Sequence, residues 1–196
     1  MSSYGVDATI KTTSGVVFSD LGFTSDTDFD TYIATLNAAA SERVNSYCRR
    51  DFDLHTAESV KQRGSNSFTM TLPFRPVISI TSIARESTTV DSDDYQIKPV
   101  PNSPYNSGAI ENFYQWWYKV YYYTTVFNWG YSTPPADIIQ VTEQLVRSEL
   151  QRMSRKFADG EFTSLSFGGY SISIGDGNST DAATLSQLDR YRAVVL

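Results

Sequence analysis

The residues best suited to catalysis are too few and too scattered to predict an active site. His55 is the only histidine and Cys48 the only cysteine among 196 residues. A general base or a thiol nucleophile needs a partner within hydrogen-bonding reach, and nothing in the sequence places Cys48 or a serine beside His55. We therefore predict that the chain is not an enzyme and that Cys48 is a small buried hydrophobe.

Ligand patterns for metals and cofactors are equally weak. One histidine and one cysteine cannot supply a zinc cluster, and the glycines of the C-terminal part match neither a P-loop nor a dinucleotide-binding fingerprint. Asp176, Asn178 and Asp181 offer oxygen atoms for calcium, but their spacing is not that of an EF-hand loop, so a solvated turn is favoured. We expect no metal and no cofactor.

A run of aromatic residues between 113 and 129 indicates contact with another molecule. Exposed rings stack on sugars or bases, whereas half-buried rings build a core and a subunit interface. Basic residues are not interleaved with these rings, and the net charge of −6 disfavours gripping of nucleic acid. We predict core plus interface, with Trp117, Tyr121 and Tyr123 between subunits; the alternative is a carbohydrate-binding module using Trp116 or Trp117.

Two long helices are predicted around these residues. Ser25, followed three residues later by Asp28, is typical of a helix start, and apolar residues then recur at helical spacing, which predicts a helix over about 26–50. Prolines at 134 and 135 are well placed to open a second helix over about 136–158. Its apolar residues cover about half of its circumference, which favours contact with two neighbours.

Glu149 lies within the apolar arc of the second helix, where an unpaired charge is costly. Two outcomes are equally favoured: an ion pair with an arginine, either on the first helix or on another subunit, or contact with water. With Arg152, Glu149 is a candidate contact between subunits.

Between the helices the apolar pattern alternates, which predicts strands at 68–72, 77–83, 95–97 and 119–127. Residues 91–94 form an acidic cluster that is typical of an exposed turn, and residues 99–108 have the composition of a loop. The expected fold is α+β, a small helical bundle with an inserted antiparallel β lobe over about 54–129.

The ends of the chain have a different composition. Residues 1–24 are predicted to form an arm with a short strand or turn, residues 25–158 the central domain, and residues 159–196 a C-terminal segment with a strand and a short helix. Residues 1–7 lack the pattern of a signal peptide, and no apolar stretch reaches the about 20 residues of a membrane helix. We expect synthesis in a cytoplasm.

The order of these elements resembles the head–tail connector family of tailed viruses, also called adaptor or head-completion proteins. The resemblance covers residues 24 to 192. Its most specific parts are the bend PFRPV at 73–77, the strand DYQI at 94–97, and the helix start GYSTPPADI at 130–138.

The resemblance implies a structural protein of the virion neck. Members form a ring, commonly of twelve copies, that docks on the portal protein above a tail or stopper protein while double-stranded DNA passes through without sequence-specific binding. The C-terminal segment would contact the portal, with Tyr191 and Arg192 as candidates. Tyr170, Ile172 and Ile174 either add a strand to a portal edge or pair within their own fold. A tail-completion or stopper protein is the alternative.

Overall fold

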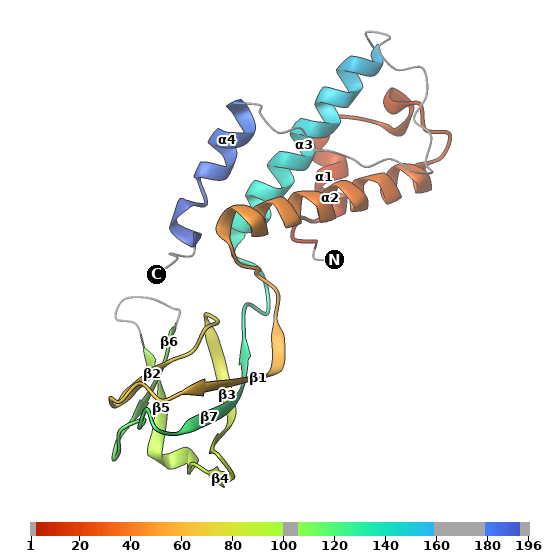
Figure 1. Ribbon diagram of the computed structural model, residues 1–196. Coiled ribbons are helices and arrows are strands. Elements are labelled where there is room, and N and C mark those ends of the chain that lie inside the picture. The colour runs from red at the N-terminus through yellow and green to blue at the C-terminus, as the bar shows by residue number, and fades with distance from the viewer. Residues whose placement is uncertain (1–2, 100–105, 159–178, 193–196) are drawn as a thin grey trace. The chain divides into compact units, whose positions relative to one another are not determined.

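The protein has the expected α+β fold, with helices and antiparallel sheets in separate parts of the chain (Figure 1). The computed structural model describes residues 3–99, 106–158 and 179–192. A helical unit contains residues 1–51 and 134–196, and a β unit contains residues 52–133. None of the helices in these described ranges is long and apolar enough to cross a membrane.

Two helices of 23 residues form the frame of the helical unit, α2 (Asp26–Cys48) and α3 (Ala136–Ala158). The predicted start of α2 is confirmed, because the Ser25 hydroxyl accepts a hydrogen bond from the Asp28 amide at 3.2 Å. The two helices pack against each other through their apolar faces. The buried apolar residues include Phe29, Ile33, Leu36, Ala40 and Val44 on α2, and Ile138, Val141, Leu145, Val146 and Leu150 on α3.

The N-terminal residues pack into this unit, where the sequence predicted an arm with a short strand or turn. They form helix α1 (Asp7–Ser14) and the short 3-10 helix η1 (Phe18–Leu21), which bury Ile10 and Leu21 completely. Buried Asn37 holds this segment, since its side chain accepts from the Gly5 amide at 3.0 Å and donates to the Gly5 carbonyl at 2.7 Å. Helix α1 escaped prediction because its sequence is almost entirely polar.

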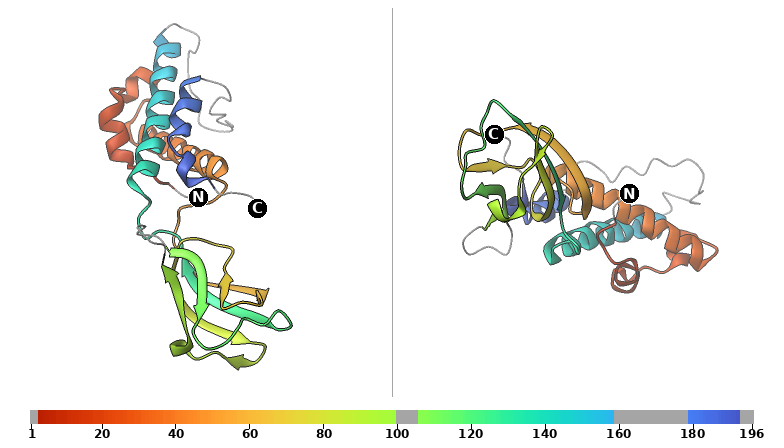
Figure 2. Two further views of the ribbon diagram at one scale, coloured as in Figure 1. Left: turned by 90° about the vertical axis from the view of Figure 1, so that its left-hand side faces the viewer. Right: turned by 90° about the horizontal axis from the view of Figure 1, so that it is seen from below.

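The C-terminal part of the helical unit contains the predicted short helix. Helix α4 (Ser179–Ser186) lies beside α3, and the 3-10 helix η3 (Asp189–Tyr191) follows it (Figure 2). Leu185 and Leu188 are buried. The apolar contact of this segment is therefore small, and polar groups supply most of its other contacts.

The β unit contains two antiparallel sheets. The four-stranded sheet has the order β1-β7-β3-β4 and the three-stranded sheet the order β2-β6-β5. The strands are β1 (His55–Arg63), β2 (Thr69–Thr71), β3 (Val77–Arg85), β4 (Thr88–Thr89), β5 (Tyr95–Pro99), β6 (Asn106–Asn112) and β7 (Tyr122–Trp129), with the 3-10 turn η2 at Ser92–Asp94.

Four of these strands, β2, β3, β5 and β7, coincide with predicted ones. The other two long strands were missed for different reasons. Edge strand β1 has only one half-buried aliphatic residue, Val60, packed on the core, and β6 begins within a stretch whose composition predicts a loop. One cluster of buried residues joins the two sheets, with Met70 and Ile110 from one and Ile83 and Phe127 from the other.

The buried Asn37 gives a direct test of how the N-terminal segment is held. Replacing Asn37 with Ala leaves the Gly5 amide and carbonyl without their side-chain partner, and we expect a loss of about 1–3 kcal/mol in the free energy of unfolding. Urea denaturation measures this value. The exposed Thr35→Ala change on the same helix is the control; equal stability of the two variants would contradict the contact.

Candidate assembly surfaces

The two aromatic residues Trp117 and Tyr123, predicted to lie between subunits, belong to the core of the β unit. Trp117 is 1% exposed and Tyr123 3%, and their rings meet edge to face with centroids 5.0 Å apart. This prediction is wrong for a physical reason: Tyr123 lies on the inward face of β7, and Trp117, in the connection before β7, packs against it. Sequence alternation alone does not say which face is inward.

Tyr121 is the third of these predicted contacts and is half-buried. It packs against the core cluster, and the Arg85 guanidinium carbon lies 5.1 Å from the centre of its ring. Tyr121 therefore remains available at the surface only in part, held by a cation–π contact.

Burial of Trp117 fixes the connection between β6 and β7. The Trp117 indole nitrogen donates to the Phe68 carbonyl at 3.0 Å, and its backbone amide donates to the Ser67 carbonyl at 2.8 Å. At the start of the connection, the Asn112 side chain accepts from the amides of Tyr114 and Gln115 at 2.9 and 2.8 Å. Backbone and side chains thus hold this loop in one conformation.

The same loop carries exposed apolar side chains, which we call the aromatic platform. Trp116 is 43% exposed and Tyr114 77%, and Trp116 leans edge-on against Phe68 with centroids 6.0 Å apart. Sequence reasoning placed an interface in this run but chose its buried members; the exposed ones become visible only once Trp117 is placed. The platform comprises Phe113, Tyr114, Trp116, Tyr118 and Val120.

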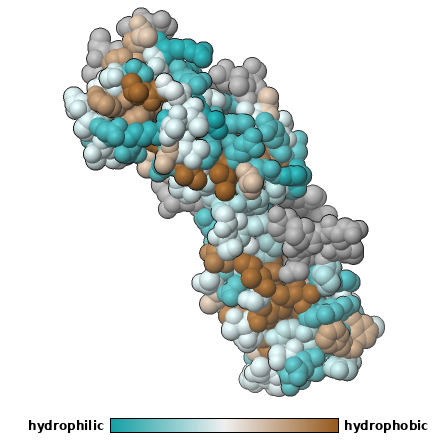
Figure 3. Space-filling view, turned by 180° about the vertical axis from the view of Figure 1, so that it is seen from behind, coloured by the Kyte–Doolittle hydropathy of each residue, from teal (hydrophilic) through white to brown (hydrophobic). Residues whose placement is uncertain are grey.

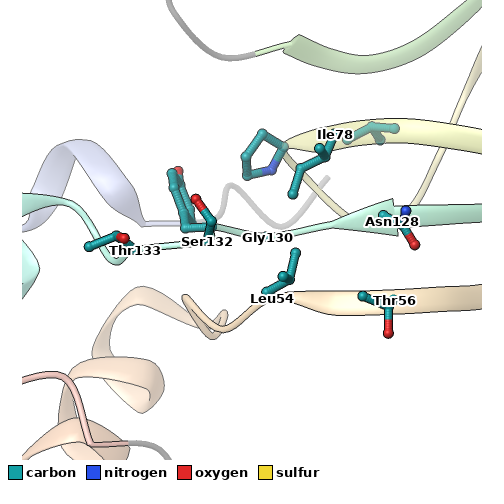
Figure 4. A pocket seen from close by; sticks show the side chains of 10 residues that line it. Leu54, Thr56, Ile78, Asn128, Gly130, Ser132 and Thr133 are labelled. Carbon is teal, nitrogen blue, oxygen red and sulfur yellow. The ribbon is translucent and has the colours of Figure 1, made fainter.

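A pocket of about 500 Å³ lies elsewhere on the β unit, where β7 ends (Figure 4). We call it the terminal pocket. Exposed Leu54 and Ile78 give it apolar walls, while Thr56, Ser132 and Thr133 bring hydroxyl groups. Figure 3 shows apolar residues at the surface over the β unit from one side of the molecule. None of the pocket's lining residues carries a carboxylate, ammonium or guanidinium group.

Asn128 shapes the pocket by joining three strands. Its side-chain oxygen accepts from the Ala57 amide of β1 at 2.8 Å, and its nitrogen donates to the Ser79 hydroxyl of β3 at 2.9 Å. Ala57 is in the left-handed region with φ 54°, at a bulge in β1. The bulge and the Asn128 side chain together set the positions of Thr56 and Ile78.

Glu149 has its arginine partner on its own helix. Arg152 of α3 donates to it from two guanidinium nitrogens, Nε and Nη2, and the Nε–Oε2 distance is 2.9 Å. The prediction of an arginine on the first helix or another subunit is corrected, because a three-residue spacing brings the two groups to the same side of the helix. The Glu149 side chain is 7% exposed and that of Arg152 37%. Burial, reinforced by the nearby Glu149 carboxylate, raises the pKa of Tyr32 to about 12.

The two described candidates for portal contact, Tyr191 and Arg192, lie where η3 meets the helical unit. The Tyr191 hydroxyl donates to Asp137 of α3 at 3.0 Å, and the guanidinium carbon of Arg192 lies 5.1 Å from the centre of the Tyr47 ring. Arg190 pairs with the same Asp137 carboxylate. The other three candidates, Tyr170, Ile172 and Ile174, lie outside the described residues.

Neither Cys48 nor His55 is placed for catalysis. Cys48 is completely buried, and this burial raises the pKa of its thiol to about 11, so the interpretation of Cys48 as a buried hydrophobe is confirmed. His55 stacks on Trp129 with ring centroids 4.0 Å apart. Across the described ranges, no group of three or more His, Cys, Asp or Glu side chains is placed to hold a metal.

The Glu149–Arg152 pair makes a prediction about stability. Arg152→Ala leaves a buried carboxylate without its charge partner, so we expect a loss of about 2–4 kcal/mol in the free energy of unfolding. Glu149→Leu combined with Arg152→Met removes both charges and should recover most of that loss, because no buried charge remains. Chemical denaturation of the three proteins decides this; a double variant as unstable as Arg152→Ala would contradict it.

Burial of Cys48 gives a reporter for the C-terminal segment, since Asp189 and Arg192 both act electrostatically on its thiol. Leu188→Ala removes a buried side chain from this segment. If the variant loses about 1.4 kcal/mol of stability in this segment, the population in which the segment is open rises about tenfold. The rate at which a thiol reagent labels Cys48 should therefore rise at least about tenfold. The exposed Ser186→Ala change is the control; unchanged labelling in Leu188→Ala would show that the segment does not cover Cys48.

No curated protein sequence matches the chain significantly. One chain from the neck of an empty GTA particle computed with C6 symmetry aligns with 15% identity and a TM-score of 0.49, covering 98% of this chain and 91% of that one. A chain from the virion of a native gene transfer agent particle aligns with 16% identity and a TM-score of 0.48, at the same coverage.

The family comparison covers most of the sequence. The family model described as head completion protein matches residues 18–194, a range that includes both long helices, the β unit and the short C-terminal helix. The match confirms the predicted head–tail connector role and location at the head–tail junction of the virion. The chain belongs to the head completion protein family.

Proposed function

We propose that copies of this chain assemble into a ring of twelve that docks on the portal protein and joins the DNA-filled head to a tail or stopper protein. The family supports the general role. The observation that carries the ring is the aromatic platform, a rigid apolar surface that the core of its own unit does not use. Exposed apolar patches of this kind mark protein–protein contacts.

The proposal includes passage of double-stranded DNA through the ring. DNA is densely charged, and a protein that grips it neutralises phosphates with lysine and arginine. The net charge of this chain is −6. An acidic ring repels the phosphate backbone, so DNA crosses it without a binding step that would hold it in the neck.

We also propose that the protein performs no catalysis. Its single thiol is buried with a raised pKa, and its single imidazole stacks on an indole ring. These two side chains are the nucleophile and general base that the sequence offers most directly, and neither is placed for chemistry.

The contacts with the portal are assigned to the C-terminal segment. Tyr170, Ile172 and Ile174 alternate with serines in the sequence, a pattern suited to strand addition at a sheet edge. Tyr191 and Arg192 lie at the surface of the helical unit, where Tyr191 donates to Asp137 and Arg192 lies over the Tyr47 ring. Arg152, partly exposed beside buried Glu149, is assigned to the contact between neighbouring subunits.

Mixing the chain with its cognate portal protein tests this function. We expect electron microscopy to show a ring of twelve copies on one face of the portal. Ile172→Asp with Ile174→Asp should reduce docking at least about thirtyfold, the factor that corresponds to losing one hot-spot side chain. Ser171→Asp with Ser173→Asp adds the same charge on the alternate side chains and is the matched control.

Two results would contradict the proposal. Absence of a ring on the portal at virion-like concentrations would remove the connector assignment, and assembly on the tail without portal would favour a stopper protein instead. Equal docking of the isoleucine and serine variants would remove strand addition while leaving the ring intact.

A further inference from the structure

We propose that the aromatic platform of one copy inserts into the terminal pocket of a second copy, and that this head-to-tail contact builds the ring. The inference rests on the proposed ring and names the surfaces that close it. Both features belong to the β unit, so the argument depends only on residues placed within one unit.

Contacts within the β unit hold the platform in its conformation in the single chain. Trp117 anchors it in the core, and the Asn66 amide donates to the Trp117 carbonyl at 2.7 Å. Gly64 lies so close to the carbonyls of Trp117 and Tyr118 that a side chain there would collide with them. A rigid display of tyrosine, tryptophan and phenylalanine loses little conformational entropy on binding, which is the property of strong interface anchors.

The terminal pocket has the chemistry that these side chains need. Leu54 and Ile78 are both 46% exposed, an unusual state for two large aliphatic residues in one pocket. A volume of about 500 Å³ lies within the range that takes aromatic ligands. Hydroxyl groups at Thr56, Ser132 and Thr133 suit the phenol and indole N–H groups of entering tyrosine and tryptophan rings. With no charge in the lining, insertion leaves no buried ion unpaired.

The positions of the two features, at opposite ends of β7, allow a head-to-tail contact. The platform precedes Tyr122, the first residue of β7, and the pocket surrounds Asn128 and Gly130 at its other end. Eight residues of strand span about 24 Å at the usual rise of about 3.4 Å per residue. A contact between two different surfaces repeats from copy to copy, and it forms a closed ring when the rotation between copies divides a full turn.

A second copy is the occupant that the surfaces favour. On the described part of the helical unit, Val6 and Val17 are the only large hydrophobic residues that are exposed. Nine of the exposed large hydrophobic residues fall in the β unit: the five of the platform, Leu54 and Ile78 of the pocket, and Phe68 and Tyr122. The chain therefore carries both halves of one apolar contact and little other apolar surface to compete for either half.

The inference can be tested with two variants, one lacking the platform and the other lacking the pocket. The platform variant carries Tyr114→Ser and Trp116→Ser, and the pocket variant carries Thr56→Arg and Ile78→Arg; all four positions are exposed, so the fold should survive. Each variant alone should self-associate at least about thirtyfold more weakly than the unaltered chain. An equimolar mixture should form a one-to-one dimer and nothing larger, because one intact platform meets one intact pocket.

Native mass spectrometry and sedimentation velocity measure these states on the full chain. Thr81→Arg, an exposed change on β3 outside the pocket, and Val17→Ser on the helical unit are the controls, and both should assemble like the unaltered chain. A mixture that stays monomeric while the unaltered chain assembles would overturn the inference. A platform variant that assembles normally and loses only portal or tail binding would also overturn the inference. That result would not contradict the proposed ring.

A disulfide trap covers the case in which the isolated chain stays monomeric. Tyr114→Cys and Ile78→Cys, made in separate proteins and mixed under oxidising conditions, should give a cross-linked heterodimer, while Thr81→Cys replacing Ile78→Cys should not. Buried Cys48 does not interfere. Absence of the heterodimer at millimolar concentration, or equal cross-linking of the Thr81→Cys control, would overturn the inference, whereas docking of the chain on the portal is measured independently.

Discussion

Burial of one indole ring determines how the β unit presents itself to other proteins. Trp117 is inside the core and hydrogen-bonded to the Phe68 carbonyl at 3.0 Å. Its neighbours Trp116 and Tyr118 stay at the surface, 43% and 44% exposed. Burial of Trp117 thus fixes the connection between β6 and β7 and the platform that it carries. Formation of the core fixes the aromatic platform before it binds anything. The exposed rings of the platform add no stability to the isolated unit.

In the helical unit the main feature is the pairing of charged side chains. Its buried or partly buried charges meet partners within the unit, as Glu149 does with Arg152 and Arg43 does with Asp181 at 2.9 Å. Exposed ion pairs contribute little to stability, whereas buried carboxylates need such partners. The unit therefore presents a mainly polar surface in its described part.

The aromatic run also separates the binding hypotheses. A sugar-binding face needs a flat, exposed tryptophan; Trp117 is in the core, which leaves Trp116, in T-shaped contact with Phe68, as the exposed tryptophan of the run. Membership in the head completion family points to a protein partner instead. Tyrosine and tryptophan held on a rigid loop supply that partner with contact area at low entropic cost.

The sequence by itself determined the features that depend on local periodicity. It predicted both long helices, the start of α2 at Ser25, strands β2, β3, β5 and β7, the inert Cys48 and the family. It did not predict α1, whose docking depends on Asn37 thirty residues away, or β1, an edge strand with few apolar residues. Only the tertiary structure decided which rings of the aromatic run face inward, and that Glu149 finds its arginine on its own helix. Which face of a strand points inward depends on contacts with residues distant in the chain, so no local pattern encodes it. The Glu149–Arg152 pair is local in sequence, but the sequence also offered an arginine elsewhere or contact with water, and the structure decided among them.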